Sequence, residues 1–250
     1  MKFEEANQTR NFAALAAFFM FSAVVLITFY KLEVIPGVSY IYSLIAPNIT
    51  PNAVGSIIFD FRGYDTLGET LILITAVITV GVVFGRGAFV KEELRELRHV
   101  TPTSIQSVFG TPVVLILMVF GLLLIFGGHI TPGGGFQGGS VMATAFFISI
   151  IIYGLKEENP YEYGHGFLIG METLGALIFL LIGVFGIAVS GYYLYNVGAN
   201  IWGQGFLAYL KYLDPTNAGI IPYLNVAVGL EVFGSLSIAF VFLAEAKEHD

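Results

Sequence analysis

Long uncharged apolar runs alternate with short polar segments along this chain. A bilayer-spanning helix needs about 20 mostly apolar residues, and six runs approach or reach that length: Phe12–Tyr30, Leu67–Phe84, Val108–Gly127, Phe136–Leu155, Phe167–Ser190 and Leu224–Ala244. The stretch Tyr192–Leu210 is also uncharged, but it mixes amide and aromatic side chains as interfacial segments do. The pattern predicts an all-α, polytopic integral membrane protein with about six transmembrane helices, seven being possible.

Positively charged residues fall unevenly on the segments between these runs. With six spans and a cytoplasmic N-terminus, the inner segments hold most of the 11 lysines and arginines: Lys2, Arg10, Arg86, Lys91, Arg95, Arg98, Lys156 and Lys247. The outer segments hold Lys31, Arg62 and Lys211. Because cytoplasmic loops carry the excess of lysine and arginine, both termini are predicted to face the cytoplasm. A seventh span would leave the imbalance unchanged and would move the C-terminus outside.

Composition narrows the function classes further. Charged residues make up 12% of the chain, against about 25% in an average soluble domain, and the mean hydropathy is +0.81. The net charge of −7 argues against a nucleic-acid partner, which selects clustered lysine and arginine. The chain has no cysteine, which excludes thiolate zinc and iron–sulfur ligation by its own residues. We therefore expect no bound metal or cofactor, and we expect any redox chemistry to occur elsewhere.

Two parts of the chain are distinguishable, residues 1–100 with two spans and residues 101–250 with four. A helix is predicted to end near His99–Ser104, because Pro102 disfavours helix at the residue before it. The preceding stretch Gly87–Arg98 mixes acidic and basic residues, which indicates either an amphipathic helix at the inner surface or a solvated linker helix. The apolar stretch Ala53–Phe59 predicts a surface or re-entrant helix.

The segment Gly128–Gly139 interrupts two membrane-length runs with six glycines, a proline and a histidine. Glycine tolerates backbone angles that other residues avoid and lets another backbone approach closely. Irregular backbone at membrane depth persists only where protein buries it or where it lines a water-filled cavity. We therefore predict a structural loop formed by Pro132, Gly133, Gly134, Gly135, Gly138 and Gly139.

Acidic residues at or inside predicted spans are costly and mark ion or proton pathways by default. Glu69 must join its helix for that helix to reach a full span, and Asp65 lies four residues earlier on the same face. One interpretation is that both guide cations at the outer membrane edge. The other is that they are helix N-terminal acids that meet the positive dipole end, with Arg62 pairing one of them.

Three further residues are candidates for the same pathway. Glu172 lies about 8 Å into its span from the inner side, and Glu231 lies about 10 Å into the last span from the outer side. Both acids either handle protons or Na⁺, or make interhelical hydrogen bonds as protonated carboxyls. His129 either caps a helix C-terminus or relays protons.

Three motifs carry a resemblance to a known family, the Mrp-type multisubunit cation/proton antiporters. The segment Gly128–Gly139 reads G-H-I-T-P-G-G-G-F-Q-G-G and resembles the G-H-x-x-P-G-G-G-F-x-G-G signature of the MnhB/MrpB-like subunit. Asn225–Val232 is similar to the last helix of that subunit. Phe59–Glu69 resembles the D-F-R-G-x-D-T-L-G-E stretch near the C-terminal end of the large MnhA/MrpA-like subunit. The chain therefore resembles a fusion of the C-terminal piece of the large subunit with the MnhB/MrpB-like subunit.

The resemblance implies a non-redox subunit of an ion-translocating complex in the cell membrane that is not an enzyme by itself. Na⁺ or H⁺ would be the transported ion, and the partners would be the lipid bilayer and other Mrp-type membrane subunits. In archaeal respiratory complexes of this kind, an Mrp-like module is joined to a hydrogenase-like or sulfur-reducing arm. The alternatives are membership of a stand-alone Mrp antiporter and a structural scaffold that only holds the membrane arm together.

Overall fold

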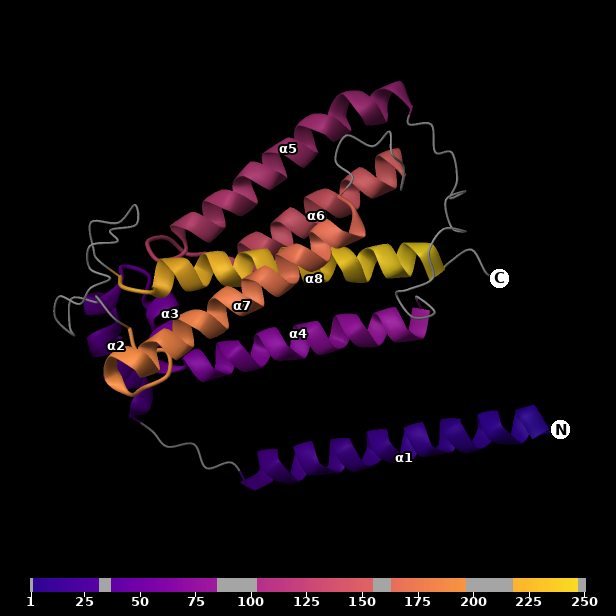
Figure 1. Cartoon of the computed structure of the whole chain (residues 1–250), viewed down its shortest axis with the longest axis horizontal. Coiled ribbons are helices and arrows are strands. Elements are labelled where there is room, and N and C mark those ends of the chain that lie inside the picture. The colour runs from indigo at the N-terminus through magenta and orange to yellow at the C-terminus, as the bar shows by residue number, and fades with distance from the viewer. Residues whose placement is uncertain (1, 32–36, 85–102, 155–162, 197–217, 247–250) are drawn as a thin grey trace. The chain divides into compact units, whose positions relative to one another are not determined.

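A computed structural model of the chain describes residues 2–31, 37–84, 103–154, 163–196 and 218–246. Contacts divide the chain into two compact units, Met1–Ile41 and Tyr42–Asp250, and each is described by itself. The first unit contains α1 (Lys2–Lys31) and the start of α2 (Val38–Ile49). The second contains the rest of α2 and the following helices (Figure 1): α3 (Ala53–Ser56), the π-helix η1 (Ile57–Phe61), α4 (Gly63–Phe84), α5 (Ser104–Gly127), α6 (Gly135–Tyr153), α7 (His165–Ser190) and α8 (Ile221–Ala246).

Each run that the sequence predicts as a span coincides with a helix, although α6 ends at Tyr153, before the predicted end at Leu155, which lies outside the described residues. In the described part of the chain, five helices are long and apolar enough to cross a membrane, namely α4, α5, α6, α7 and α8. The first predicted span lies in α1, whose apolar segment Leu15–Lys31 is shorter. The chain is thus an all-α multi-pass membrane protein. The predicted surface helix Gly87–Arg98 lies outside the described residues, as does the ambiguous Tyr192–Leu210 stretch beyond Asn196.

The junctions between helices follow local sequence signals. Thr103 caps α5, because its hydroxyl accepts from the Gln106 N–H while the Gln106 side chain accepts from the Thr103 N–H, and such reciprocal capping satisfies two donors at once. The predicted helix at Ala53–Phe59 is present as α3 and η1. It is part of the core rather than a surface element, since Phe59 is buried in the same apolar cluster as residues of α7 and α8.

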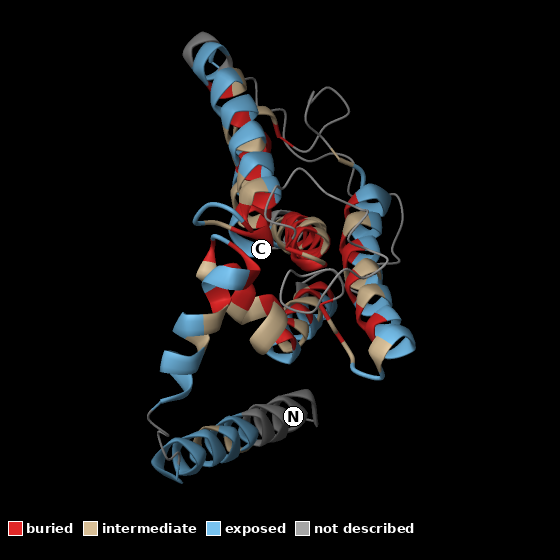
Figure 2. Cartoon of the chain, turned by 90° about the vertical axis from the view of Figure 1, so that its left-hand side faces the viewer, coloured by how far each residue is buried: buried red, intermediate tan, exposed pale blue. Residues whose placement is uncertain are grey.

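Helix α8 is the central element of the second unit. It contacts α4, α5, α6 and α7, and two thirds (67%) of its most apolar window is buried, against 44% for α6 and 22% for each of α4, α5 and α7. Figure 2 shows burial concentrated on the central helix, while the surrounding helices are buried on one side. The outward sides of those helices expose large apolar side chains such as Ile72, Leu123 and Leu181, as expected for a chain with a lipid or protein neighbour.

Glycines let the backbones of α5, α6, α7 and α8 come close together. A Cβ atom built on Gly138 of α6 would lie 2.5 Å from the Gly121 carbonyl oxygen of α5, and one on Gly139 would lie 2.7 Å from the Gly229 carbonyl oxygen of α8. A Cβ on Gly175 of α7 would collide with the Ala227 carbonyl oxygen of α8. Small residues at such crossings allow the close van der Waals packing that drives helix association in membranes.

We expect Gly175→Ala to destabilise the fold by about 1–3 kcal/mol, because the added methyl group collides with backbone that cannot rotate away. The thermal unfolding midpoint of the purified protein in detergent, followed by circular dichroism, measures the effect. Gly170→Ala on the same helix is the control, because a Cβ there meets nothing within 4 Å. It should leave the midpoint unchanged or raise it slightly, since alanine is the better helix former. Equal midpoints for the two variants would contradict the packing argument.

Candidate functional site

Two glutamates meet in the core between α7 and α8. The Ser235 hydroxyl donates to Glu172 Oε1 at 2.7 Å and lies 3.4 Å from Glu231 Oε1. The side chains of Glu172, Glu231 and Ser235 are 8%, 1% and 0% exposed. Glu231 Oε2 has no hydrogen-bond partner among the residues that the structure describes. A buried carboxyl pair joined by one hydroxyl is able to hold a proton or a cation, since two bare carboxylates at such a place repel each other.

A repeated spacing brings the two acids together. Each helix carries a glutamate followed three residues later by glycine, Glu172 with Gly175 in α7 and Glu231 with Gly234 in α8. Residues three apart share a helix face. A Cβ on Gly175 would lie 2.7 Å from Glu231 Cβ, and one on Gly234 would lie 2.6 Å from the Glu172 nitrogen. The two antiparallel helices therefore cross with each glycine against the glutamate segment of the other helix. This E-x-x-G repeat is visible in the sequence, and it is the signal that could have paired the acids.

The sequence predicts Glu172 toward the inner side and Glu231 toward the outer side, but the structure places both beside Ser235. The helices explain the difference, because α7 begins two residues before the predicted span and α8 begins three residues before it. At 1.5 Å per residue, each acid then lies deeper, about 10 Å and about 15 Å from the first residue of its helix. Because α7 and α8 are antiparallel, acids whose depths are counted from opposite ends of the bundle come within reach of the same serine hydroxyl.

The predicted glycine loop is present as irregular backbone between α5 and α6. Gly133 and Gly134 have φ of 154° and 152°, a region that is essentially restricted to glycine. The Gly135 N–H at the start of α6 donates to Asn225 Oδ1 of α8 at 2.9 Å. Asn225 is fully buried, so α8 supplies the cap that the first turn of α6 needs.

Asn52, which the sequence did not single out, attaches α3 to this loop. Its amide nitrogen Nδ2 donates to the carbonyl oxygens of Gly128 at 2.7 Å and Thr131 at 3.0 Å, and its backbone N–H donates to the His129 carbonyl at 3.2 Å. The same side chain caps α3 by accepting from the Val54 N–H at 3.2 Å. A polar residue before a short apolar helix is the signal that indicates such a cap.

His129 lies at the same junction and is fully buried, two residues after the end of α5. Its backbone carbonyl accepts from the Asn52 N–H, and a Cβ atom on Gly55 of α3 would lie 3.9 Å from the His129 Cα, so α3 packs against this position. The position is consistent with either interpretation of His129, as a structural residue at a helix end or as a proton relay.

The other two predicted residues lie on the surface of the chain. Asp65 is exposed and pairs with Arg62 at 2.5 Å, which is the N-terminal ion pair that the sequence left open as the structural alternative. Glu69 is exposed one turn later on α4. The structure therefore brings Glu172 and Glu231 together, places His129 in the glycine-loop junction, and leaves Asp65 and Glu69 on the α4 surface.

Asp60 is a further acid, half-buried, which the sequence did not mark as a candidate. It belongs to η1, outside the spanning helices, and its Oδ2 atom is buried without a partner among the described residues. Burial raises the pKa of Asp60 to about 6, and the facing Asn196 side chain opposes the rise by hydrogen bonding. Asn196 also accepts from the Ile220 N–H at 2.9 Å just before α8. Asn196 thus lies near Asp60 of η1 and bonds to the residue before α8.

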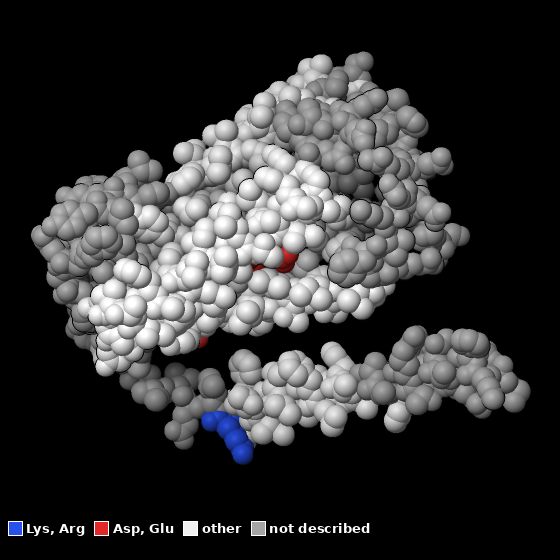
Figure 3. All heavy atoms as spheres, viewed as in Figure 1, with Lys and Arg blue, Asp and Glu red and all other residues white. Residues whose placement is uncertain are grey.

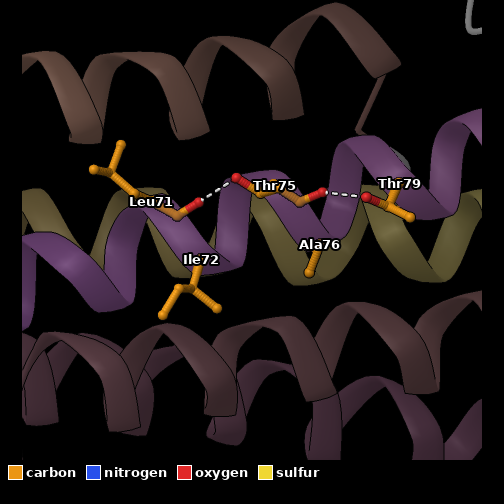
Figure 4. Close-up of a pocket in the computed structure, with 5 residues that line it drawn as sticks. All are labelled: Leu71, Ile72, Thr75, Ala76 and Thr79. Carbon is orange, nitrogen blue, oxygen red and sulfur yellow. Dashed lines mark hydrogen bonds between the residues drawn. The ribbon is translucent and has the colours of Figure 1, made fainter. Parts of the chain in front are cut away.

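The open recess on α4 is a different kind of surface. It has a volume of about 530 Å³ and is lined by Leu71, Ile72, Thr75, Ala76 and Thr79. Figure 4 shows that Thr75 and Thr79 donate hydrogen bonds to carbonyls of their own helix. Both bonds are 2.7 Å long, so neither hydroxyl proton is free to bind a ligand in the recess. The recess offers a mostly apolar packing face.

Among the residues that the structure describes, charged side chains are sparse on the face drawn in Figure 3. Figure 3 shows acidic atoms in a hollow near the middle of the face seen in Figure 1. Within the described ranges, no three His, Asp or Glu side chains gather closely enough to form a metal-binding cluster.

Comparison with known proteins gives consistent matches. Residues 105–238 match the family model described as a domain related to the MnhB subunit of Na⁺/H⁺ antiporters. The chain is 39% identical to the uncharacterized protein MJ1307 of Methanocaldococcus jannaschii, over 96% of this chain and 94% of that protein. It is 42% identical over 76 residues to the putative antiporter subunit mnhB2 of Staphylococcus aureus, a match that spans 28% of this chain and 54% of that subunit.

Two solved structures share the fold. A chain of the membrane-bound sulfane sulfur reductase, an archaeal respiratory membrane complex, superposes with a TM-score of 0.66 and 25% identity, over 92% of this chain and 97% of that chain. A chain of the Mrp complex from Dietzia sp. DQ12-45-1b superposes with a TM-score of 0.60 and 18% identity, over 97% of this chain and 26% of that chain. The second likeness concerns the fold alone.

Asn52→Ala should destabilise the fold by about 1–3 kcal/mol, because it leaves the buried Gly128 carbonyl and the partly buried Thr131 carbonyl without their donor. Thermal unfolding of the purified protein measures the loss. The control is Asn48→Ala, since Asn48 is exposed and donates only within its own helix, to the Leu44 carbonyl. A loss no larger than that of the control would show that Asn52 does not hold the loop.

Asp60 predicts a pH dependence of stability. Its pKa is about 6 in the folded chain against 3.8 unfolded, so the folded chain binds the proton more tightly. Its contribution to stability is therefore fully present below pH 4 and is lost as the pH rises to about 6. Asp60→Asn should raise the stability at pH 7 by about 1–2 kcal/mol, allowing for partial exposure, and should flatten the melting-temperature profile between pH 4 and pH 6. The control Asp65→Asn alters an exposed acid and should leave the profile in place; an unchanged profile in Asp60→Asn would refute the assignment.

Proposed function

Because the chain belongs to the family of domains related to the MnhB subunit of Na⁺/H⁺ antiporters, we propose that it is a non-catalytic membrane component of a multisubunit ion-translocating complex. In that complex it contributes to a pathway for Na⁺ or H⁺. The transported ion is a substrate in passage, and the chain itself performs no redox step.

The observation that carries the proposal is the buried pair Glu172 and Glu231. Carboxyl groups inside spanning helices cost several kcal/mol unless protein or water compensates them. Here the two acids share Ser235 in the core, where hydrophobic residues of similar size would pack at less cost. Retaining two acids at one crossing is therefore best explained by a role in binding and releasing a cation. Glu69 and Asp65 on α4, together with His129 at the glycine loop, would extend the pathway toward the predicted outer side.

The complex that we propose is an Mrp-type antiporter module within a respiratory assembly of the cell membrane. The likeness to a chain of the sulfane sulfur reductase complex covers nearly the full length of both chains, which favours a complex of that type over a stand-alone antiporter. Its partners would be other Mrp-type membrane subunits and a hydrogenase-like or sulfur-reducing peripheral arm. The exposed apolar sides of α4, α5 and α7 would supply the surfaces on which the membrane partners pack.

A structural scaffold is the second candidate function. It is favoured by the close glycine contacts of α6 and α8 and by the attachment of Asn52 to the glycine loop, since these features build a rigid frame without any need for ion movement. If the chain is only a scaffold, substitutions at these glycines or at Asn52 should impair assembly of the complex without a selective loss of ion transport.

Replacing Glu69 or Glu172 by glutamine in the assembled complex should abolish Na⁺-dependent pumping, because the amide keeps the shape of the side chain but lacks the negative charge and cannot take up a proton. Uptake of ²²Na⁺ by inverted membrane vesicles measures the pumping activity. Thr173→Ala is the control beside Glu172, as Thr173 is exposed and bonds only to carbonyls of its own helix. Co-purification of the other subunits must remain normal. Unchanged Na⁺ flux in both glutamine variants would remove the transport function and leave the scaffold.

A further inference from the structure

The hydrogen atoms at Ser235 determine how the two glutamates are joined. A serine hydroxyl has one proton to donate and two lone pairs that accept. Its oxygen lies 2.7 Å from Glu172 Oε1 and 3.4 Å from Glu231 Oε1. The short contact has the length expected of a hydroxyl that donates to a carboxylate, so the proton lies there. Only the Ser235 lone pairs then face Glu231, and an attractive second contact requires a proton on the Glu231 side.

The surroundings of Glu231 point to the same arrangement. Its side chain is 1% exposed, and Oε2 has no donor among the described residues. An ionised carboxylate without donors in a dry core carries a far larger free-energy cost than a neutral carboxyl group. Glu172, by contrast, is 8% exposed and receives the Ser235 proton. The geometry distinguishes a neutral partner, Glu231, from a charged partner, Glu172.

We propose that Glu172, Ser235 and Glu231 form a single proton-binding unit, in which the Ser235 hydroxyl transfers one shared proton between the two carboxyl groups. This inference rests on the proposed function and names the ion handled at this crossing as H⁺. In the transfer, the Glu231 O–H bond breaks as its proton bonds to Ser235 Oγ, and the original Ser235 O–H bond breaks as that proton bonds to Glu172. The hydroxyl is regenerated, and the negative charge passes from Glu172 to Glu231. The 3.4 Å contact must first shorten by about half an ångström.

The ligand set at the crossing suits a proton better than Na⁺. Membrane sites for Na⁺ draw on carbonyl oxygens of unwound helices. Here α7 and α8 are continuous through residues 165–190 and 221–246, so the nearby carbonyls are engaged in helical hydrogen bonds. Among the described residues, the side-chain oxygens joined at the crossing belong to two carboxyls and one hydroxyl, which is enough to hold a proton between them.

The infrared carbonyl band of protonated carboxylic acids tests the unit in the purified, assembled complex at pH 7, without any transport measurement. The wild-type complex should show a band that Glu231→Gln abolishes and that both Glu172→Gln and Ser235→Ala shift. Ser237→Ala should leave it unchanged, because Ser237 is equally buried in α8 but has no partner among the described residues. Replacing K⁺ by Na⁺ in the buffer should not remove the band. If Ser235→Ala fails to assemble, Ser235→Cys replaces it, since a thiol keeps the volume but is a weak donor.

Proton-coupled turnover in proteoliposomes should fall on the order of tenfold or more in Ser235→Ala and should be retained in Ser235→Thr and Ser237→Ala. The absence of a band that depends on Glu231, or its loss in Na⁺, would overturn the proton unit while leaving the proposed transport function standing. Unchanged turnover in Ser235→Ala alone would overturn the relay. The expected band with normal transport in every glutamine variant would uphold the proton-binding unit and overturn the proposed function instead.

Discussion

The backbone of α8 approaches its neighbours at glycine positions, and the rest of the second unit depends on this approach. Gly139 of α6 and Gly175 of α7 each face α8 backbone with no room for a side chain. Between helices in a bilayer there is no hydrophobic driving force, so close packing and interhelical hydrogen bonds must supply the attraction. Because α8 is contacted in this way from two sides, its polar residues Asn225, Glu231 and Ser235 lie inside protein rather than against lipid.

The same contacts produce both candidate features of the chain. Where α6 begins, Asn225 of α8 caps the irregular loop, which lets a non-helical segment persist where protein buries it. Where α7 crosses α8, the glycine that follows each glutamate by one turn allows the two acids to share Ser235. Close packing and the buried acid pair are thus one arrangement in this family member, and the proposed transport role and the scaffold role would both depend on the same glycines.

Much of the fold was predictable from the sequence because it depends on local features. The length of the apolar runs predicted the spans, and the six glycines after Gly127 predicted the irregular loop. The pairing of Glu172 with Glu231 was not predicted, because depth was counted separately from each helix end and the crossing of α7 with α8 was not considered. Asn52 was missed because the carbonyl groups to which its side chain donates lie more than 70 residues away in the sequence. Asp60 was missed as well, because its partial burial arises from tertiary packing around η1, which the sequence of that segment does not reveal.

The sequence by itself determined that this chain is an all-α membrane protein of the MnhB-related family, since hydropathy and a contiguous motif are properties of short segments. It also determined which acids stand inside spans, because the charge of a residue is read directly. Only the tertiary structure decided which of those acids meet, which remain on the surface of α4, and that a serine lies between two of them. Those facts depend on the crossing of antiparallel helices, which no single segment encodes.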